Sequence, residues 1–231
     1  MKEYIITIDG GTTNTRCILW DSHQKKVDEE SRAIGVRNTS IDGNNHRLKG
    51  AVKECLDQLL KKNEITYKQV SRIIGSGMIT SEVGLAVVPW IKAPAGIKEL
   101  AEHTVDIELP EICPIPISFI PGIKNQQENG SFRLIEAMDI MRGEEVEGVA
   151  VIESCHIGNP MLLVLPGSHN KFVAVDENKK ITGCLTTISG ELLAAITYHT
   201  LIAKSVHSEF VSEKSYNKEW MFRGYDTAKK V

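Results

Sequence analysis

The sequence lacks any long apolar run. No hydrophobic stretch approaches the roughly 20 residues that a membrane-spanning helix needs, so we expect no membrane partner. The chain also lacks a large excess of either charge. A net charge of −3 over 231 residues gives no reason to expect nucleic acid as a partner. The chain enters a β-rich run at Tyr4, with Asp9 in it, so we expect no secretory leader.

Cysteine is scarce and scattered. The five cysteines are odd in number and never form a CxxC pair: Cys17, Cys55, Cys113, Cys155 and Cys184. This pattern argues against a disulfide framework and a structural zinc site, and it favours a reducing cytoplasm. Cys17 stands within an apolar run, where we expect it to be a small buried residue.

The segment Tyr4–Asp21, YIITIDGGTTNTRCILWD, organises the chain. Two β-rich runs are separated by a glycine turn, which predicts a hairpin. The polar tip suits a polyanion with a metal, since glycines admit phosphate oxygens to backbone N–H groups and Asp9 can hold Mg²⁺. The alternative is a plain polar hairpin. The candidate residues are Asp9, Gly11, Thr12, Thr13, Asn14 and Arg16.

Strand and helix patterns alternate in the next segments, which predicts an α/β domain. The expected elements are a strand over 27–34, polar turns over 35–45, an amphipathic helix over 46–62, and a strand over 70–74 that ends in a glycine turn.

The stretch 75–123 is rich in glycine and proline, which predicts a loop-rich substrate or lid region. Gly75–Met78 follows a strand, where ligand sites of α/β sheets gather. A tight turn explains this short motif equally well.

Further along, Glu144 and Glu145 stand where a helix is expected to start. Their spacing alone favours helix N-terminal chemistry over catalysis.

The segment Met161–Gly190 repeats the opening hairpin: strand, glycine turn, polar tip, second strand and a lysine-bearing turn. Gly167–Asn170 aligns with Gly11–Asn14, and Asp176 aligns with Asp21 after one gap. We expect two like domains facing each other across a cleft, although a chance likeness of two hairpins is the alternative. Ser189 is then expected to cap a last helix, whose core stripe is Leu192, Leu193, Ile196 and Leu201.

Several stretches resemble the 2-dehydro-3-deoxygalactonokinase family, sugar-acid kinases of the actin/hexokinase/Hsp70 superfamily. They are IDGGTTNTR, GSGMITSEVGL, VPWIKAPAG, FIPGIK, DIMRGEE, LPGSHNKFV and TTISGEL, spread over residues 4 to about 200. Gly10 replaces the Trp that is usual in the first motif. The resemblance implies an α/β fold of two ribonuclease H-like (actin-like ATPase) domains, over 1–142 and 143–231. Because no adenosine-binding segment follows, we expect the second domain to be incomplete.

The resemblance implies an ATP- and Mg²⁺-dependent kinase for the terminal hydroxyl of 2-dehydro-3-deoxy-D-galactonate. It assigns Glu144 as general base, with Glu145 as the fallback, and Asp9 as the metal ligand. Gly167, Ser168, His169 and Lys171 would join the first tip on ATP, although His169 and Lys171 also fit a turn residue and a solvated strand residue. The substrate candidates are Arg37, Met78, Lys92 and Arg142. The alternatives are a non-catalytic binding remnant and a kinase for another small sugar or sugar acid.

Overall fold

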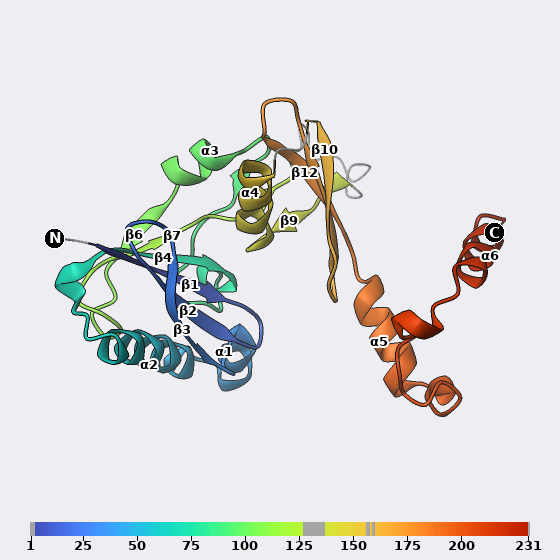
Figure 1. Ribbon diagram of the computed structural model, residues 1–231, viewed down its shortest axis with the longest axis horizontal. Coiled ribbons are helices and arrows are strands. Elements are labelled where there is room, and N and C mark those ends of the chain that lie inside the picture. Colours follow the sequence, from blue (N-terminus) through green and yellow to red (C-terminus); the bar gives the residue numbers. More distant parts are fainter. Residues whose placement is uncertain (1–2, 127–136, 156–157, 159, 231) are drawn as a thin grey trace. The chain divides into compact units, whose positions relative to one another are not determined.

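The computed structural model describes residues 3–126, 137–155, 158 and 160–230 (Figure 1). The chain divides into two compact units. The first comprises Met1–Leu165 with Lys171–Thr186, and the second comprises Pro166–Asn170 with Thr187–Val231. Neither unit ends at residue 142, and the division expected there stays a prediction. The α/β class, with mixed sheets, is confirmed.

A six-stranded mixed sheet forms the centre of the first unit, in the order β3-β2-β1-β4-β7-β6. Its strands are β1 (Tyr4–Gly10), β2 (Thr15–Trp20), β3 (Lys26–Arg32), β4 (Val70–Gly77), β6 (Val105–Ile107) and β7 (Ile117–Phe119). Strand β1 pairs antiparallel with β2 and parallel with β4. The predicted opening hairpin is therefore confirmed, and its tip lies at the end of β1 beside the end of β4.

Helix α2 (His46–Lys62) packs on β2 and β3 and confirms the expected amphipathic helix. Its apolar stripe, with Leu48 and Leu56 fully buried, closes the main core. The polar turns expected over 35–45 are wrong for most of that stretch, which forms α1 (Val36–Asp42). There the Asn38 side chain accepts the N–H of Gly35 at 3.1 Å. A short 3₁₀ turn, η1 (Tyr67–Gln69), precedes β4.

The stretch 75–123, expected to be rich in loops, contains more regular secondary structure than its composition indicates. It supplies β6 and β7 to the main sheet, and it also contains η2 (Met78–Thr80), β5 (Ile91–Lys92), α3 (Ile97–Glu102) and the start of β8 (Ile123–Lys124). Strands β5 and β8 form a small sheet with β9 (Ile140–Met141). A lid role for this stretch stays a prediction.

Helix α4 (Glu144–Ser154) begins where the sequence predicts, with Glu144 and Glu145 in its first turn. A three-stranded sheet follows, with β10 (Met161–Leu165), β11 (Asn170–Val175) and β12 (Ile181–Thr187) in that order. The predicted second hairpin is therefore present, because β10 and β11 are antiparallel. A second apolar core, which includes Ile152, Val173 and Ile181, joins α4 to this sheet.

The second unit contains α5 (Ser189–His199), η4 (Leu201–Lys204), η5 (Glu213–Ser215) and α6 (Lys218–Ala228). The capping role expected for Ser189 is wrong, because Ile188 is the N-cap and Ser189 instead accepts a hydrogen bond from Asn170 at 2.6 Å. The expected core stripe is also wrong, since all four of its side chains are exposed: Leu192, Leu193, Ile196 and Leu201. No helix in the described ranges combines the length and apolar character that crossing a bilayer requires.

Candidate functional site

The first tip is a tight turn fixed by backbone hydrogen bonds. The N–H of Gly11 donates to the carbonyl of Asn14 at 2.9 Å, and the N–H of Arg37, in the first turn of α1, donates to the carbonyl of Thr12 at 2.9 Å. A Cβ on Gly35 would lie 2.5 Å from the carbonyl oxygens of Gly11 and Thr12. Glycine at position 35 therefore lets the start of α1 dock against the tip.

A polar hollow of about 370 Å³ opens at this tip. It is lined by Asp9, Gly11, Thr13, Asn14, Arg16 and Ser31. Asp9 and Arg16 form an ion pair at 3.2 Å, and both side chains are more than half exposed. The hollow thus offers one carboxylate beside hydroxyl, amide and guanidinium donors, the set that a metal-bound polyphosphate needs.

The second tip has the same build. The N–H of Gly167 donates to the Asn170 side chain at 2.9 Å, and the N–H of Glu191, in the first turn of α5, donates to the carbonyl of Ser168 at 2.9 Å. A Cβ on Gly190 would lie 2.1 Å from the carbonyl oxygen of Gly167. Each tip is therefore held by the start of a following helix through a glycine that admits no side chain.

His169 contacts the first turn of α5. Its Nε2 lies 3.0 Å from Oε2 of Glu191, and both side chains are exposed. The sequence interpretation of His169 as a turn residue or a phosphate contact stays open.

Glu144 and Glu145 are adjacent in sequence but differ in environment. Oε2 of Glu144 accepts the N–H of Arg142 at 3.0 Å, and the side chain keeps 31% of its surface exposed. Both oxygens of Glu145 accept the N–H of Gly143, at 2.9 and 2.8 Å, and the residue is fully buried. Burial raises the pKa of Glu145 to about 7. Glu144 is therefore the carboxylate that a substrate can reach.

Three glycines bring the start of α4 against the ends of β1 and β4. Gly77 has φ +83°, and its added Cβ would lie 2.9 Å from the carbonyl oxygen of Gly10. Gly143 has φ +119°, and its added Cβ would lie 3.3 Å from Cα of Gly77.

In the first turn of α4, burial raises the pKa of Glu147, as do the charges of Glu144 and Asp9. The sequence interpretation missed Glu147, whose spacing from Glu144 places both on one helix face.

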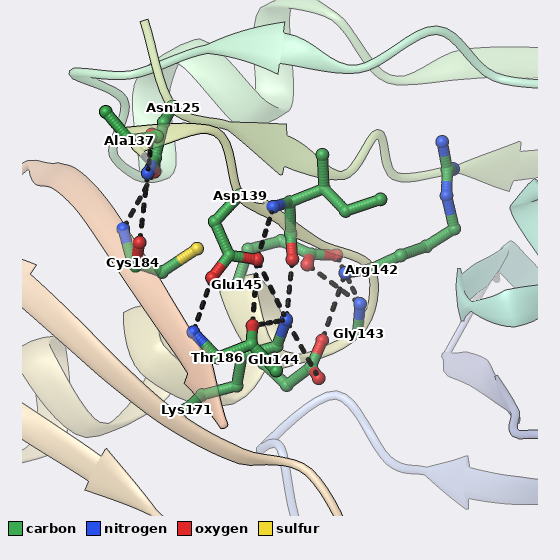
Figure 2. Close-up of polar contacts among 11 residues, drawn as sticks. Asn125, Ala137, Asp139, Arg142, Gly143, Glu144, Glu145, Lys171, Cys184 and Thr186 are labelled. Carbon is green, nitrogen blue, oxygen red and sulfur yellow. Dashed lines mark hydrogen bonds and ion pairs between the residues drawn. The ribbon is translucent and has the colours of Figure 1, made fainter. Parts of the chain in front are cut away.

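Lys171 lies inside the protein instead of on a solvated strand face (Figure 2). Its Nζ donates to the Ile140 carbonyl and the Thr186 hydroxyl, both at 2.6 Å. Asp139 lies 3.7 Å and Glu144 lies 4.0 Å from the same nitrogen. The interpretation of Lys171 as a solvated residue is wrong, because β9, β12 and α4 close around its ammonium group. Asp139 and Thr186 were missed, since no local pattern marks them.

The guanidinium group of Arg142 is engaged by other residues of the protein. It donates to the Thr80 carbonyl at 2.7 Å and the Val88 carbonyl at 3.0 Å, and it also contacts the Thr80 hydroxyl. The guanidinium carbon stacks over the Trp90 ring at 4.0 Å. Through these contacts Arg142 fixes the segment from Thr80 to Trp90.

The other substrate candidates lie on three further elements. Arg37 is exposed in α1, and Met78, half-buried, opens η2 directly after Gly77. Lys92 is exposed in β5 and stands beside Lys124 of β8 in the parallel register. The two lysines line a cavity of about 220 Å³ whose other walls are Asn125, Met138, Asp139 and Ile140. Lys124 was missed by the sequence interpretation.

The described part of the chain contains no group of three or more His, Cys, Asp or Glu side chains placed to hold a metal. Asp9 fits Mg²⁺ nevertheless. Mg²⁺ commonly keeps several waters and takes one or two carboxylates together with substrate phosphates. The exposed carboxylate of Asp9 at the polar hollow meets that description.

Comparison with known proteins gives a consistent result. The family model described as 2-keto-3-deoxy-galactonokinase matches residues 9–227. The 2-dehydro-3-deoxygalactonokinase of Escherichia coli (strain K12) is 27% identical over 202 residues, which cover 87% of this chain and 59% of that protein.

A solved structure shares the fold. A Sinorhizobium meliloti protein assigned as a 2-dehydro-3-deoxygalactonokinase has a TM-score of 0.68 and is 23% identical, with 90% of this chain and 62% of that chain covered. The chain thus spans about 60% of the length of these two relatives.

Proposed function

Because the chain belongs to the 2-keto-3-deoxy-galactonokinase family, we propose that the protein phosphorylates the terminal hydroxyl of 2-dehydro-3-deoxy-D-galactonate with ATP. The observation that carries the proposal is the placement of Glu144. This carboxylate is partly exposed, is held by the Arg142 N–H, and lies in the unit that also bears the first polar tip. A carboxylate so placed suits the general base of a hydroxyl acceptor.

Phosphoryl transfer requires positioning and charge stabilisation more than covalent chemistry. Glu144 would accept the proton of the attacking hydroxyl. Asp9 would hold Mg²⁺, which supplies charge neutralisation at the phosphates when it is bound. The polar and backbone groups of the first tip would contact phosphate oxygens, as would those of the second. These residues are Gly11, Thr12, Thr13, Asn14, Arg16, Gly167, Ser168 and His169.

The carboxylate of the sugar acid requires a cation, and Lys92 is the candidate that the geometry favours. It stands beside Lys124 at a cavity, and within the described residues neither lysine has a carboxylate within ion-pair distance. Arg142 serves the substrate indirectly, by fixing the segment from Thr80 to Trp90, which directly follows Met78 and Ile79, whereas Arg37 remains a secondary candidate on α1. Two like charges in register are stabilised when an anion binds between them.

The repeated strand, tip and strand also support the proposal of two ribonuclease H-like domains, one built around each tip, with a boundary near residue 142. A cytoplasmic location is part of the same proposal. It rests on the five cysteines, which are all free thiols in the structure.

An ADP-release assay of the protein against a panel of 2-keto-3-deoxy sugar acids tests the proposal. Release that depends on 2-dehydro-3-deoxy-D-galactonate supports it. Release with a different acid alone would favour the kinase for another acceptor. Nucleotide binding without release for any acid would favour the non-catalytic binding remnant.

A further inference from the structure

Lys171 follows the second tip directly, which in sequence makes it look like a phosphate contact. Its side chain is only 9% exposed, and Figure 2 shows the ammonium among oxygen atoms of the protein. Two of them, the Ile140 carbonyl and the Thr186 hydroxyl, lie at 2.6 Å. A buried ammonium is stable only when the protein supplies such acceptors. Lys171 is thus already bound, without any phosphate.

Two carboxylates flank the same ammonium. Oδ1 of Asp139 lies 3.7 Å away and Oε1 of Glu144 lies 4.0 Å away. Asp139 is fixed in turn, because it accepts hydrogen bonds from the Thr186 backbone N–H and from the Thr186 hydroxyl at 2.8 Å. Lys171 therefore lies in a framework whose more exposed carboxylate is that of Glu144.

Glu144 has one hydrogen-bonded carboxylate oxygen and one that faces a cation. Its Oε2 accepts the Arg142 N–H at 3.0 Å, and its Oε1 faces Lys171. An ammonium has three protons, and two are engaged by the Ile140 and Thr186 oxygens, so one remains for the carboxylates. A general base must be aimed at its substrate, and a buried neighbouring cation attracts the carboxylate oxygen that faces it.

We propose that Lys171 is a positioning residue, which places a positive charge beside Glu144 and orients it for proton abstraction, and that it is not a ligand of the nucleotide phosphates. This inference rests on the proposed function of Glu144 as the base. The charged and titratable groups that face Glu144 are Asp139 before β9, Arg142 before α4, Glu145 and Glu147 on α4, Lys171 on β11 and the Cys184 thiol on β12. Three of them are carboxylic acids, so Lys171 offsets a local excess of negative charge.

The test is the Lys171→Met variant of the protein, with kcat, nucleotide affinity and the pH–rate profile measured together. We expect kcat to fall by about 100-fold, a typical contribution of positioned acid–base catalysis. Nucleotide affinity measured by titration calorimetry should stay within about twofold, because no phosphate contact is removed. The acidic limb of the profile should move to higher pH. Lys171→Arg, which keeps the charge, should recover part of kcat.

Two controls separate this role from general damage. Lys179→Met removes a lysine of the β11–β12 turn that pairs with Glu153 at the surface, and it should leave kcat unchanged. Thr186→Val removes one hydrogen bond of Lys171 but not its charge, so the acidic limb should stay in place. Thermal unfolding of each variant confirms that a folded protein was assayed.

A loss of nucleotide affinity of about tenfold or more, with an unchanged acidic limb, would overturn the inference and make Lys171 a nucleotide ligand. A separate arm needs no turnover. In ¹³C NMR, the protonation midpoint of the Glu144 carboxyl should move upward in Lys171→Met, and an unmoved midpoint would also overturn the inference. A wild-type protein that phosphorylates no sugar acid but shows this movement would refute the proposed function alone.

Discussion

Asp21 and Asp176 close the same turn in two different sheets. In each, one carboxylate oxygen accepts the backbone N–H groups two and four residues further on, at 2.9 and 2.9 Å for Asp21 and at 2.8 and 2.9 Å for Asp176. Gln24 and Lys179, at matching places in these turns, both have φ +62°. The likeness of the two hairpins therefore extends from each tip to the turn beyond it.

The glycines behind the two tips give the first prediction. Gly35→Ala and Gly190→Ala each place a Cβ within 2.5 Å of a tip carbonyl oxygen, so each substitution must displace its tip. We expect each to weaken nucleotide binding by at least about fivefold, or about 1 kcal/mol. Titration calorimetry measures this. The matched control is Gly50→Ala in α2, where an added Cβ meets no atom within 4 Å. Unchanged affinity in both tip variants would refute their role.

A second prediction concerns Gly10 and Ile79. A Cβ on Gly10 would lie 1.9 Å from Cγ2 of the fully buried Ile79. Gly10→Ala should lower the free energy of unfolding by about 1–3 kcal/mol through overpacking. Ile79→Ala should cost about 2–5 kcal/mol alone.

Ile79→Ala removes Cγ2, the nearest atom at 1.9 Å, and leaves only Cβ, at 2.9 Å, near the new methyl group. The double variant should therefore lose at least about 1 kcal/mol less than the sum of the two single losses. Urea denaturation of the double-mutant cycle measures this difference. Val175→Ala, in the other apolar core, serves as the uncoupled partner for Gly10→Ala. Strict additivity with Ile79→Ala would mean that the two positions do not meet.

Burial of Glu145 predicts a pH-dependent stability. Its pKa rises from 4.5 to about 7 on folding, so the folded state binds the proton more tightly than the unfolded state. The proton bound by Glu145 contributes fully to the free energy of unfolding below pH 4.5. This contribution, roughly 3 kcal/mol, is lost as the pH rises to about 7. Glu145→Gln should flatten this decline in urea denaturation between pH 4.5 and 7.5, whereas exposed Glu177→Gln should not. Equal slopes in wild type and Glu145→Gln would contradict the assignment.

The contacts of Arg142 predict a structural cost for even a conservative change. Arg142→Lys keeps the charge but cannot reproduce two carbonyl contacts and the stacking on Trp90. We expect a loss of about 1–3 kcal/mol in the free energy of unfolding. Arg47→Lys, an exposed residue paired with Asp42, is the control. Unchanged stability with a raised KM for the sugar acid would instead make Arg142 a direct substrate ligand.

The local patterns of the sequence predicted the elements that depend on neighbours in the chain. The apolar spacing over 46–62 predicted α2, and the glycine-centred tips predicted both hairpins. The acids at Glu144 and Glu145 predicted the start of α4. Each of these signals is local in the sequence: a spacing that recurs every three or four residues, a single turn between strands, or the first residues of a helix. Local propensity and periodicity decide the outcome there.

The features that sequence reasoning missed depend on long-range packing. Lys171 follows a polar tip, yet β9 and β12 enclose it through the Ile140 carbonyl and Thr186. Lys124 becomes a neighbour of Lys92 only when β5 and β8 pair. Helix α1 was the exception, because Gly43 at φ +69° was a local C-cap signal that the interpretation overlooked.

Glu144 is proposed to abstract the proton of the acceptor hydroxyl, and the turnover of the Glu144→Gln variant is the decisive measurement. Glutamine keeps the size of the side chain but cannot accept the proton as a base. We predict that turnover with 2-dehydro-3-deoxy-D-galactonate falls by about 10²–10⁴ while nucleotide affinity stays within about twofold. Glu153→Gln, at the far end of α4, should turn over normally. Near-normal turnover of Glu144→Gln would contradict the account.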